Sequence, residues 1–217
     1  MAIANQLGGT RPKILAILRR EGSVTVDGLA REIGLSSTTI RRHLDILQRD
    51  QLVYFEPVRE KSGRPAYVYT LTDDGQESGY RNYKEVLSLL LSEIAGLTAT
   101  DLSHKDGEEM VSFLIGRVAD LVSWPYLPPA ASSNEARVAK LEQALTDRGY
   151  SPELTQTDGR LEIQLSNCPV RSVACDQDGV CLLDHKIIAN ILGVDPVQQS
   201  TIRGGHTSCL YVASMEN

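Results

Sequence analysis

Apolar side chains recur at helical spacing in three short segments of the N-terminal third of the chain. The segments run from Pro12 to Arg20, from Thr25 to Ile33 and from Ser36 to Leu47, and each predicts a helix. Thr10, Thr25 and Ser36 are placed to cap the first, second and third helices, and Gly34 ends the second. Two short helices joined by a glycine-containing turn are typical of a helix-turn-helix.

The third of these helices has a polar face opposite its apolar stripe. If Ile40, Leu44 and Leu47 are buried, the helical step of about 100° per residue turns the polar positions outward. Hydroxyl and guanidinium groups suit phosphate oxygens, and an arginine in the major groove can bind guanine. A solvated face that happens to be basic is the alternative. The candidate DNA contacts on this helix are Ser37, Thr38, Thr39, Arg41 and Arg42.

A β-hairpin with a basic tip is expected next. Residues 52–57 and 66–71 alternate apolar and polar positions, and the turn between them carries Lys61 and Arg64. Alone, such a tip is usually a solvated turn, but behind a helix-turn-helix it suits phosphate or minor-groove contact. We therefore expect residues 1–75 to be a winged helix-turn-helix domain that binds a double-stranded DNA operator.

The middle of the chain predicts helices with broad apolar faces. Apolar positions crowd residues 86–97 and recur over residues 110–122. DNA-binding proteins of this kind commonly use two copies for two half-sites, so we expect residues 76–129 to be a helical segment that forms a homodimer. Packing of these faces within one chain is the alternative.

The remainder, residues 130–217, mixes the two periodicities. Helices are expected over residues 135–148 and 180–192, and an Asp158-Gly159 turn separates two strands. Residues 197–202 read as extended, and the glycine-rich loop at 204–208 leads to Cys209 and a last strand. The fold class predicted for the whole chain is α+β.

The distribution of charge also separates the N-terminal part of the chain from the remainder. Residues 1–72 carry 11 Lys+Arg and 7 Asp+Glu, or +4, whereas residues 73–217 carry 11 and 21, or −10, which gives the net charge of −6 over 217 residues. A basic N-terminal part joined to an acidic remainder is typical of a nucleic-acid reader fused to a sensing domain. No apolar run is long enough to cross a bilayer and no signal peptide is evident, so we expect a cytoplasmic protein without a membrane partner.

All four cysteines, Cys168, Cys175, Cys181 and Cys209, lie in the C-terminal part. In a reducing cytosol such a cluster indicates metal binding or redox chemistry, with scattered buried thiols as the alternative. Structural zinc sites usually draw on short C-x2–4-C pairs, and none is present here. Four separated thiolates suit an iron–sulfur cluster, for which we expect the 4Fe–4S form rather than 2Fe–2S, with zinc or a thiol–disulfide switch as the alternative.

The order Asn167-Cys168-Pro169, then Cys168-x12-Cys181, then Gly205-x3-Cys209-x-Tyr211, behind a winged helix, resembles the SufR-type regulators of the DeoR/ArsR-like group. The resemblance implies an iron–sulfur-cluster-binding repressor of cluster-assembly operons, with Cys168, Cys181 and Cys209 as ligands. It also implies that the cluster-bound form represses. Cys175 matches no family position, and Gln198 and Ser200 stand where the family often has Arg and His.

For the fourth ligand we expect Cys175, with His185 or His206 as alternatives. Asp176, Asp178 and Asp184 are expected to be loop acids and caps, because hard carboxylates are poor partners for a thiolate-held iron cluster. An enzyme with a small-molecule substrate is not expected, because no motif pairs a cysteine with His and Asp, and neither a phosphate-binding glycine loop nor a nucleophile elbow occurs. The sequence thus predicts a transcription regulator.

Overall fold

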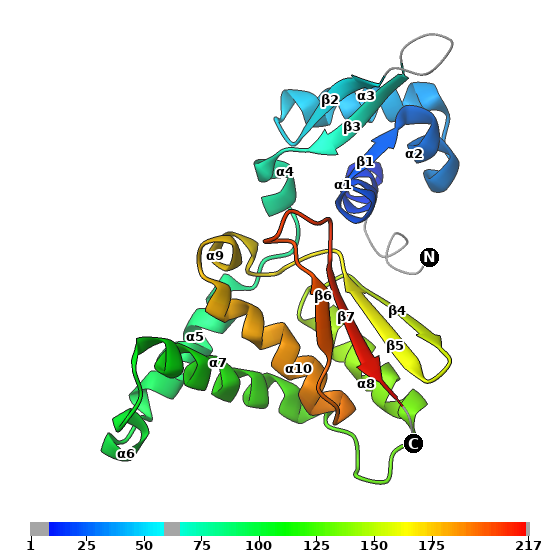
Figure 1. Ribbon diagram of the computed structural model, residues 1–217. Coiled ribbons are helices and arrows are strands. Elements are labelled where there is room, and N and C mark those ends of the chain that lie inside the picture. The colour runs from blue at the N-terminus through cyan, green and yellow to red at the C-terminus, as the bar shows by residue number, and fades with distance from the viewer. Residues whose placement is uncertain (1–8, 59–65, 216–217) are drawn as a thin grey trace. The chain divides into compact units, whose positions relative to one another are not determined.

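The computed structural model describes residues 9–58 and 66–215, and these form two compact units, Met1–Tyr80 and Arg81–Asn217 (Figure 1). The division lies five residues beyond the expected end of the DNA-binding domain. The helices of the expected middle segment pack into the core of the second unit.

The described residues of the first unit form four helices and a three-stranded antiparallel sheet of order β1-β3-β2. Thr25 accepts a hydrogen bond from the Gly28 amide and Ser36 accepts one from the Thr39 amide, so two helices begin with the side-chain caps that the sequence predicted. The first helix instead starts directly after Gly9, with Thr10 inside it. The elements are α1 (Thr10–Glu21), β1 (Ser23–Thr25), α2 (Val26–Ile33), α3 (Ser37–Arg49), β2 (Val53–Val58), β3 (Ala66–Leu71) and α4 (Asp73–Glu77).

The core of the first unit lies between the helices and the base of the hairpin. Ile40, Leu44 and Leu47 are buried, as the periodicity of the third predicted helix requires. They pack with side chains of α1 and α2 and with Val53 and Leu71, which face each other across β2 and β3. This packing fixes which face of α3 is left for solvent.

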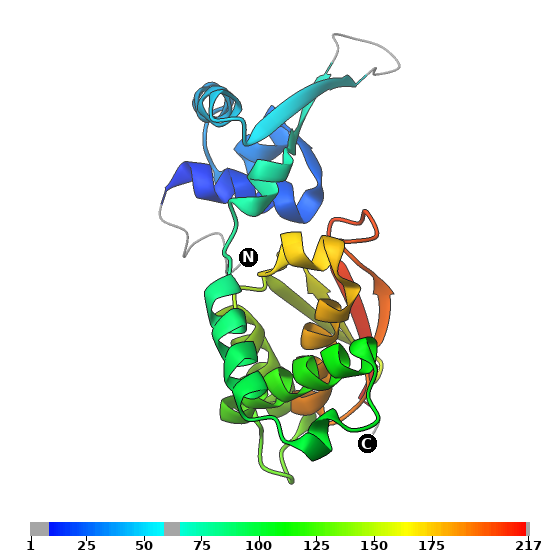
Figure 2. The same cartoon turned by 90° about the vertical axis from the view of Figure 1, so that its left-hand side faces the viewer.

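The second unit packs helices against one face of a four-stranded antiparallel sheet of order β4-β5-β7-β6 (Figure 2). Asp158 and Gly159 both have positive φ, 46° and 74°, as expected for a two-residue hairpin turn between β4 and β5. Its elements are α5 (Tyr83–Ala95), α6 (Ala99–Leu102), α7 (Gly107–Ser123), η2 (Trp124–Tyr126), α8 (Asn134–Asp147), β4 (Pro152–Thr157), β5 (Arg160–Leu165), α9 (Arg171–Asp176), η3 (Asp178–Cys181), α10 (Leu182–Leu192), β6 (Val197–Ser200) and β7 (Cys209–Ser214).

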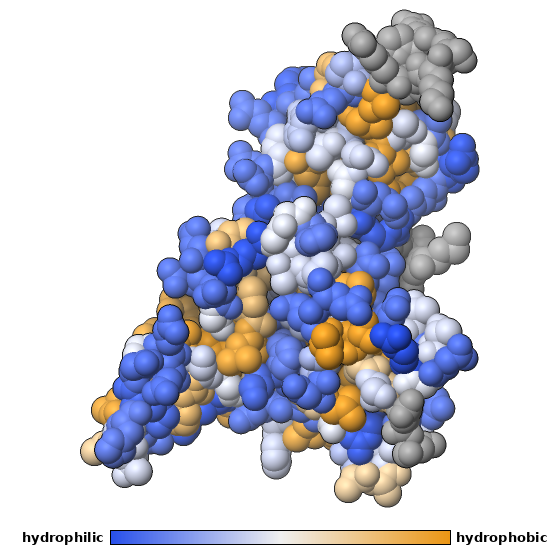
Figure 3. Space-filling view, viewed as in Figure 1, coloured by the Kyte–Doolittle hydropathy of each residue, from blue (hydrophilic) through white to orange (hydrophobic). Residues whose placement is uncertain are grey.

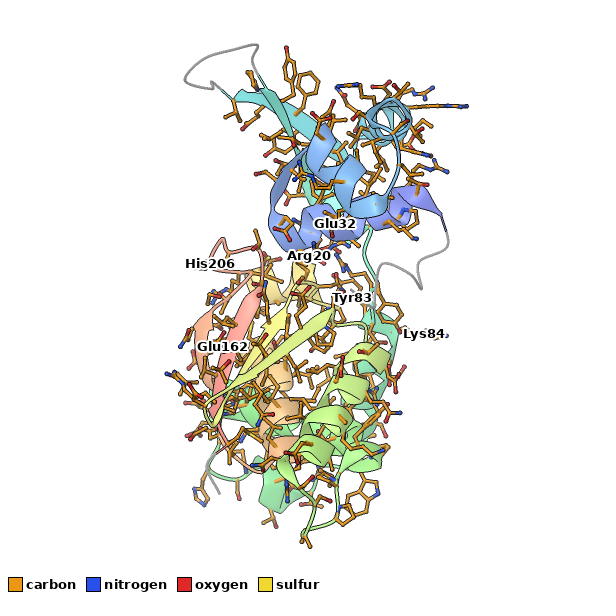
Figure 4. The ribbon with its side chains drawn as sticks, turned by 90° about the vertical axis from the view of Figure 1, so that its right-hand side faces the viewer. Arg20, Glu32, Tyr83, Lys84, Glu162 and His206 are labelled. Atoms are coloured by element: carbon orange, nitrogen blue, oxygen red, sulfur yellow. The ribbon has the colours of Figure 1, made fainter. Side chains whose placement is uncertain are left out.

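Burial along β5 shows the two faces of this sheet. Leu161, Ile163 and Leu165 are buried beneath the helices, whereas Glu162 between them is exposed (Figure 4). With two helix-packed sheets, the α+β class predicted from the sequence is confirmed.

The helices of the second unit leave apolar side chains at the surface, where Figure 3 shows several hydrophobic patches. Those on the expected dimer-forming helices and the short helix after them are Leu87, Leu91, Ile94, Val111, Leu121 and Trp124. The inner sides of α5 and α7 meanwhile contribute to the core of their own unit. The broad apolar bands in the sequence are therefore only partly covered within one chain.

Candidate functional site

All four cysteines line one cavity of the second unit, although they come from four different segments. Cys168 follows β5, Cys175 lies in α9, Cys181 ends η3 and Cys209 begins β7. The register of the sheet places Cys209 opposite Leu165, at the end of the strand that leads to Cys168. The fold thus brings together four thiols that span more than forty residues of sequence.

The four thiols differ in exposure. Cys209 is buried, Cys168 and Cys181 are half-buried, and Cys175 is exposed; all four are free thiols. The Ile202 amide donates to the Sγ of Cys209 at 3.4 Å. Burial raises the pKa of Cys181 to about 11 and that of Cys209 to about 12, and it raises the pKa of Cys168 further. The protein without metal therefore carries these three as neutral thiols at neutral pH, and a metal that binds them must displace protons.

The cavity has the donor chemistry of an iron–sulfur site and little free space. Its volume of about 20 Å³ admits about one water molecule. Across residues 9–58 and 66–215, no three His, Cys, Asp or Glu side chains are grouped closely enough to hold a single metal ion. Thiolates are the ligands that iron–sulfur clusters require, so the residues fit the group, and the walls have to part to admit it. Two of those walls, α9 and η3, are short helices that carry Cys175 and Cys181.

Asp184 also lines the cavity, and it differs from the other two acids near the cysteines because it is buried. Asp176 is exposed at the end of α9, and exposed Asp178 pairs with Arg203 at 3.3 Å. Asp184, in the first turn of α10, is only 7% exposed, and its carboxylate Oδ2 accepts a hydrogen bond from the Tyr211 hydroxyl at 3.1 Å. Burial raises the pKa of Asp184 to about 6.

The two histidines considered as ligands do not line this cavity. His185 Nε2 is 3.1 Å from the Pro196 carbonyl oxygen and 3.7 Å from a carboxylate oxygen of Asp195. His206 is exposed in the loop before β7 (Figure 4). Neither ring is therefore positioned beside the thiols.

The first residues of the second unit are bonded to the segment that carries Cys168. Arg81 Nη1 donates to the Asn167 Oδ1 at 2.9 Å and to the Cys168 carbonyl oxygen at 3.3 Å, and the Asn82 amide donates to the Pro169 carbonyl oxygen at 3.0 Å. At the start of α5 (Figure 4), the Tyr83 hydroxyl accepts from the Ser172 amide at 3.1 Å. We call residues 81–83 the latch segment. It directly follows the first unit in the chain.

In the first unit, α3 presents the expected polar face. Thr38, Arg41 and Arg42 are exposed and form no side-chain hydrogen bond or ion pair with other described residues. Ser37 differs, because its hydroxyl donates to Asp27 Oδ1 of α2 at 2.7 Å and so ties the two helices together. The Thr39 hydroxyl is hydrogen-bonded to Ser36 at 2.9 Å. Three of the five candidate side chains on this helix are thus unengaged.

An open hollow runs along this face of α3. It is lined by Thr38, Thr39 and Arg42 together with two residues that sequence reasoning missed, Arg11 and His43. Arg11 is in the first turn of α1 and its guanidinium is 4.0 Å from the Asp50 carboxylate. The hollow therefore adds Arg11 to Arg41 and Arg42 on the candidate DNA surface. Lys61 and Arg64, expected at the hairpin tip, lie outside the described residues.

Residues 9–54 match the family model described as winged helix-turn-helix DNA-binding. The N-terminal unit is a winged helix-turn-helix DNA-binding domain. The match covers α1, α2, α3 and the start of β2, so it includes the polar face of α3 and the hollow beside it. The chain accordingly carries a DNA-binding domain of the winged-helix type in its N-terminal unit.

No curated protein matches the chain. Among solved structures, Bacillus subtilis PadR in complex with operator DNA is similar at 16% identity and a TM-score of 0.27, with 61% of this chain and 89% of that chain covered. A likeness of that size does not bear on function. No described helix is long and apolar enough to cross a membrane.

Proposed function

We propose that the chain is a homodimeric transcriptional repressor whose winged helix-turn-helix domain binds an operator under the control of an iron–sulfur cluster held in the cysteine-lined cavity. The observation that carries the sensor part is that four thiols from four segments border one cavity. Cys168, Cys181 and Cys209 are the proposed core ligands. An iron–sulfur cluster supplies an oxygen- and iron-sensitive centre when bound.

The latch segment supports a physical connection between this cavity and the DNA-binding domain. Movement of Cys168 toward a shared inorganic centre would shift the Asn167 and Pro169 atoms to which Arg81 and Asn82 are bonded. The chain leaves the winged helix-turn-helix domain at Tyr80, one residue before the latch segment. A ligand shifts operator affinity only if it binds the two conformations differently, and about 3 kcal/mol of difference gives more than a hundredfold change.

The exposed apolar side chains on α5 and α7 support the dimer. Leu87, Leu91 and Leu121 are each more than two-fifths exposed. A second copy of the chain would remove this apolar surface from water, and two copies present two recognition helices to two half-sites.

Anaerobic purification tests the sensor. We expect a brown protein with broad visible absorbance that contains iron and acid-labile sulfide, and we expect tighter operator binding with the cluster than after its removal. A colourless protein with stoichiometric zinc would reject the cluster and favour a zinc site. Serine at Cys168, Cys181 or Cys209 is expected to abolish iron and sulfide retention in each case.

A further inference from the structure

The cavity contains a carboxylate that the proposed set of thiolate ligands leaves unused. Asp184 lines the cavity together with the cysteines and is almost fully buried. Within the described residues, no Lys, Arg or His forms an ion pair with it. The Tyr211 hydroxyl and the backbone amides of Asp184 and His185 stabilise the carboxylate, but no cation balances its buried charge, which is costly to a fold.

Hydrogen bonds hold this carboxylate in place. Gln198 Nε2 donates to the Tyr211 hydroxyl oxygen at 2.6 Å, and that hydroxyl donates to Asp184 Oδ2 at 3.1 Å. Tyr211 is itself fully buried in β7, two residues after Cys209. A carboxylate has about four acceptor positions, and the Tyr211 hydroxyl and the backbone amides of Asp184 and His185 occupy up to three of them, which leaves one for another partner. The side chain is thus oriented before any metal arrives.

Asp184 is also better placed than Cys175. The carboxylate is three residues after Cys181, in the first turn of the helix that follows it, and is enclosed in the unit. Cys175 borders the same cavity from α9, but it is exposed. A ligand inside the wall loses less side-chain freedom on binding than one at an exposed rim.

We propose that Asp184 is the fourth iron ligand, through a carboxylate oxygen, beside the thiolates of Cys168, Cys181 and Cys209, and that Cys175 remains a free thiol. This inference rests on the proposed function and specifies its ligand set. A carboxylate is a harder ligand than a thiolate, so the iron that it binds is the one held least tightly by a site built for soft donors. A three-thiolate, one-carboxylate site therefore suits a centre that must be lost when conditions change.

The test compares three single variants of the full-length protein, reconstituted anaerobically with iron and sulfide. Asp184→Asn keeps the size of the side chain and its acceptor for Tyr211 but removes the charge. Cys175→Ser removes the alternative ligand, and Asp176→Asn is the matched control, an exposed acid beside Cys175. Iron and sulfide per chain, the visible spectrum and Mössbauer spectra of the bound iron are measured for each.

We expect Asp184→Asn to lower cluster retention by on the order of tenfold or more, and the other two variants to match the wild type. Wild-type Mössbauer spectra should contain one iron subsite distinct from the others. Retention by Asp184→Asn, or loss in Cys175→Ser, overturns the inference while the proposed function stands. Absence of iron and sulfide from the wild type overturns the proposed function and this inference with it. Thermal unfolding of the metal-free variants verifies that Asp184→Asn is folded.

Discussion

Asp184→Asn is expected to change how the stability of the metal-free protein depends on pH. The pKa of Asp184 is raised from 3.8 to about 6, chiefly because burial disfavours the charged carboxylate. The folded state therefore binds this proton more tightly than the unfolded state does. The contribution of this proton to the free energy of unfolding is fully present below about pH 4. It is lost as the pH rises through about 6 and does not change further above that.

The size of the loss follows from the shift. The rise from 3.8 to about 6 corresponds to about 3 kcal/mol, since one pKa unit is worth about 1.4 kcal/mol. Asparagine does not titrate and can still accept the hydrogen bond from Tyr211. The variant should therefore lack this loss and be more stable than the wild type at pH 7 by up to about 3 kcal/mol.

Urea denaturation of both proteins from pH 4 to pH 8, with chelator and reductant present, measures the difference. The transition that belongs to the second unit is identified as the one that Leu44→Ala, in the core of the winged helix-turn-helix domain, leaves unchanged. The difference in free energy of unfolding between the variant and the wild type should increase from pH 4 to pH 6 and then stay constant. Parallel curves over that range would show that Asp184 does not titrate as its burial implies.

Three further outcomes are expected. Arg42→Ala should weaken operator binding by about 1–3 kcal/mol and random-DNA binding less, with Arg49→Ala as a control at the end of α3; equal losses on both DNAs would make Arg42 a phosphate contact. Leu91→Arg, on the exposed side of α5, should shift the protein from dimer to monomer in sedimentation, and an unchanged dimer would move the interface elsewhere. Arg81→Ala should reduce the ratio of operator affinities with and without the cluster while iron content stays the same, and an unchanged ratio would remove the latch segment from the coupling.

Periodicity identified most elements because their burial is one-sided. The stripe of α3, the caps at Thr25 and Ser36, and the turn at Asp158 all depend on neighbours within a few residues, so they can be predicted from the chain. Strand β1 was missed because three residues give no measurable alternation, and it exists only through its pairing with β3. Helix α9, which carries Cys175, was missed for the same reason of length.

The sequence predicted which cysteines line the cavity but not how the fold brings them together. Spacing indicated that the cysteines act together, yet their meeting depends on the pairing of β5 with β7, which links residues over forty positions apart. Asp184 carries a sequence signal of its own. It shares the buried stripe of α10 with Ile187, Ile188 and Ile191, and an acid on such a stripe is either a cost or a functional group.

The pairing of β5 with β7 determines where insertions and deletions near Cys209 can be tolerated. Cys209 faces Leu165 across the sheet, so its position is measured from the strand pairing and not along the connection from Cys181. Residues could be inserted into the loop over 204–208, beyond the Ile202 amide that contacts the sulfur, without changing the strand register that positions Cys209. A single insertion inside β7 would instead reverse its side chains and turn the thiol to the solvent face.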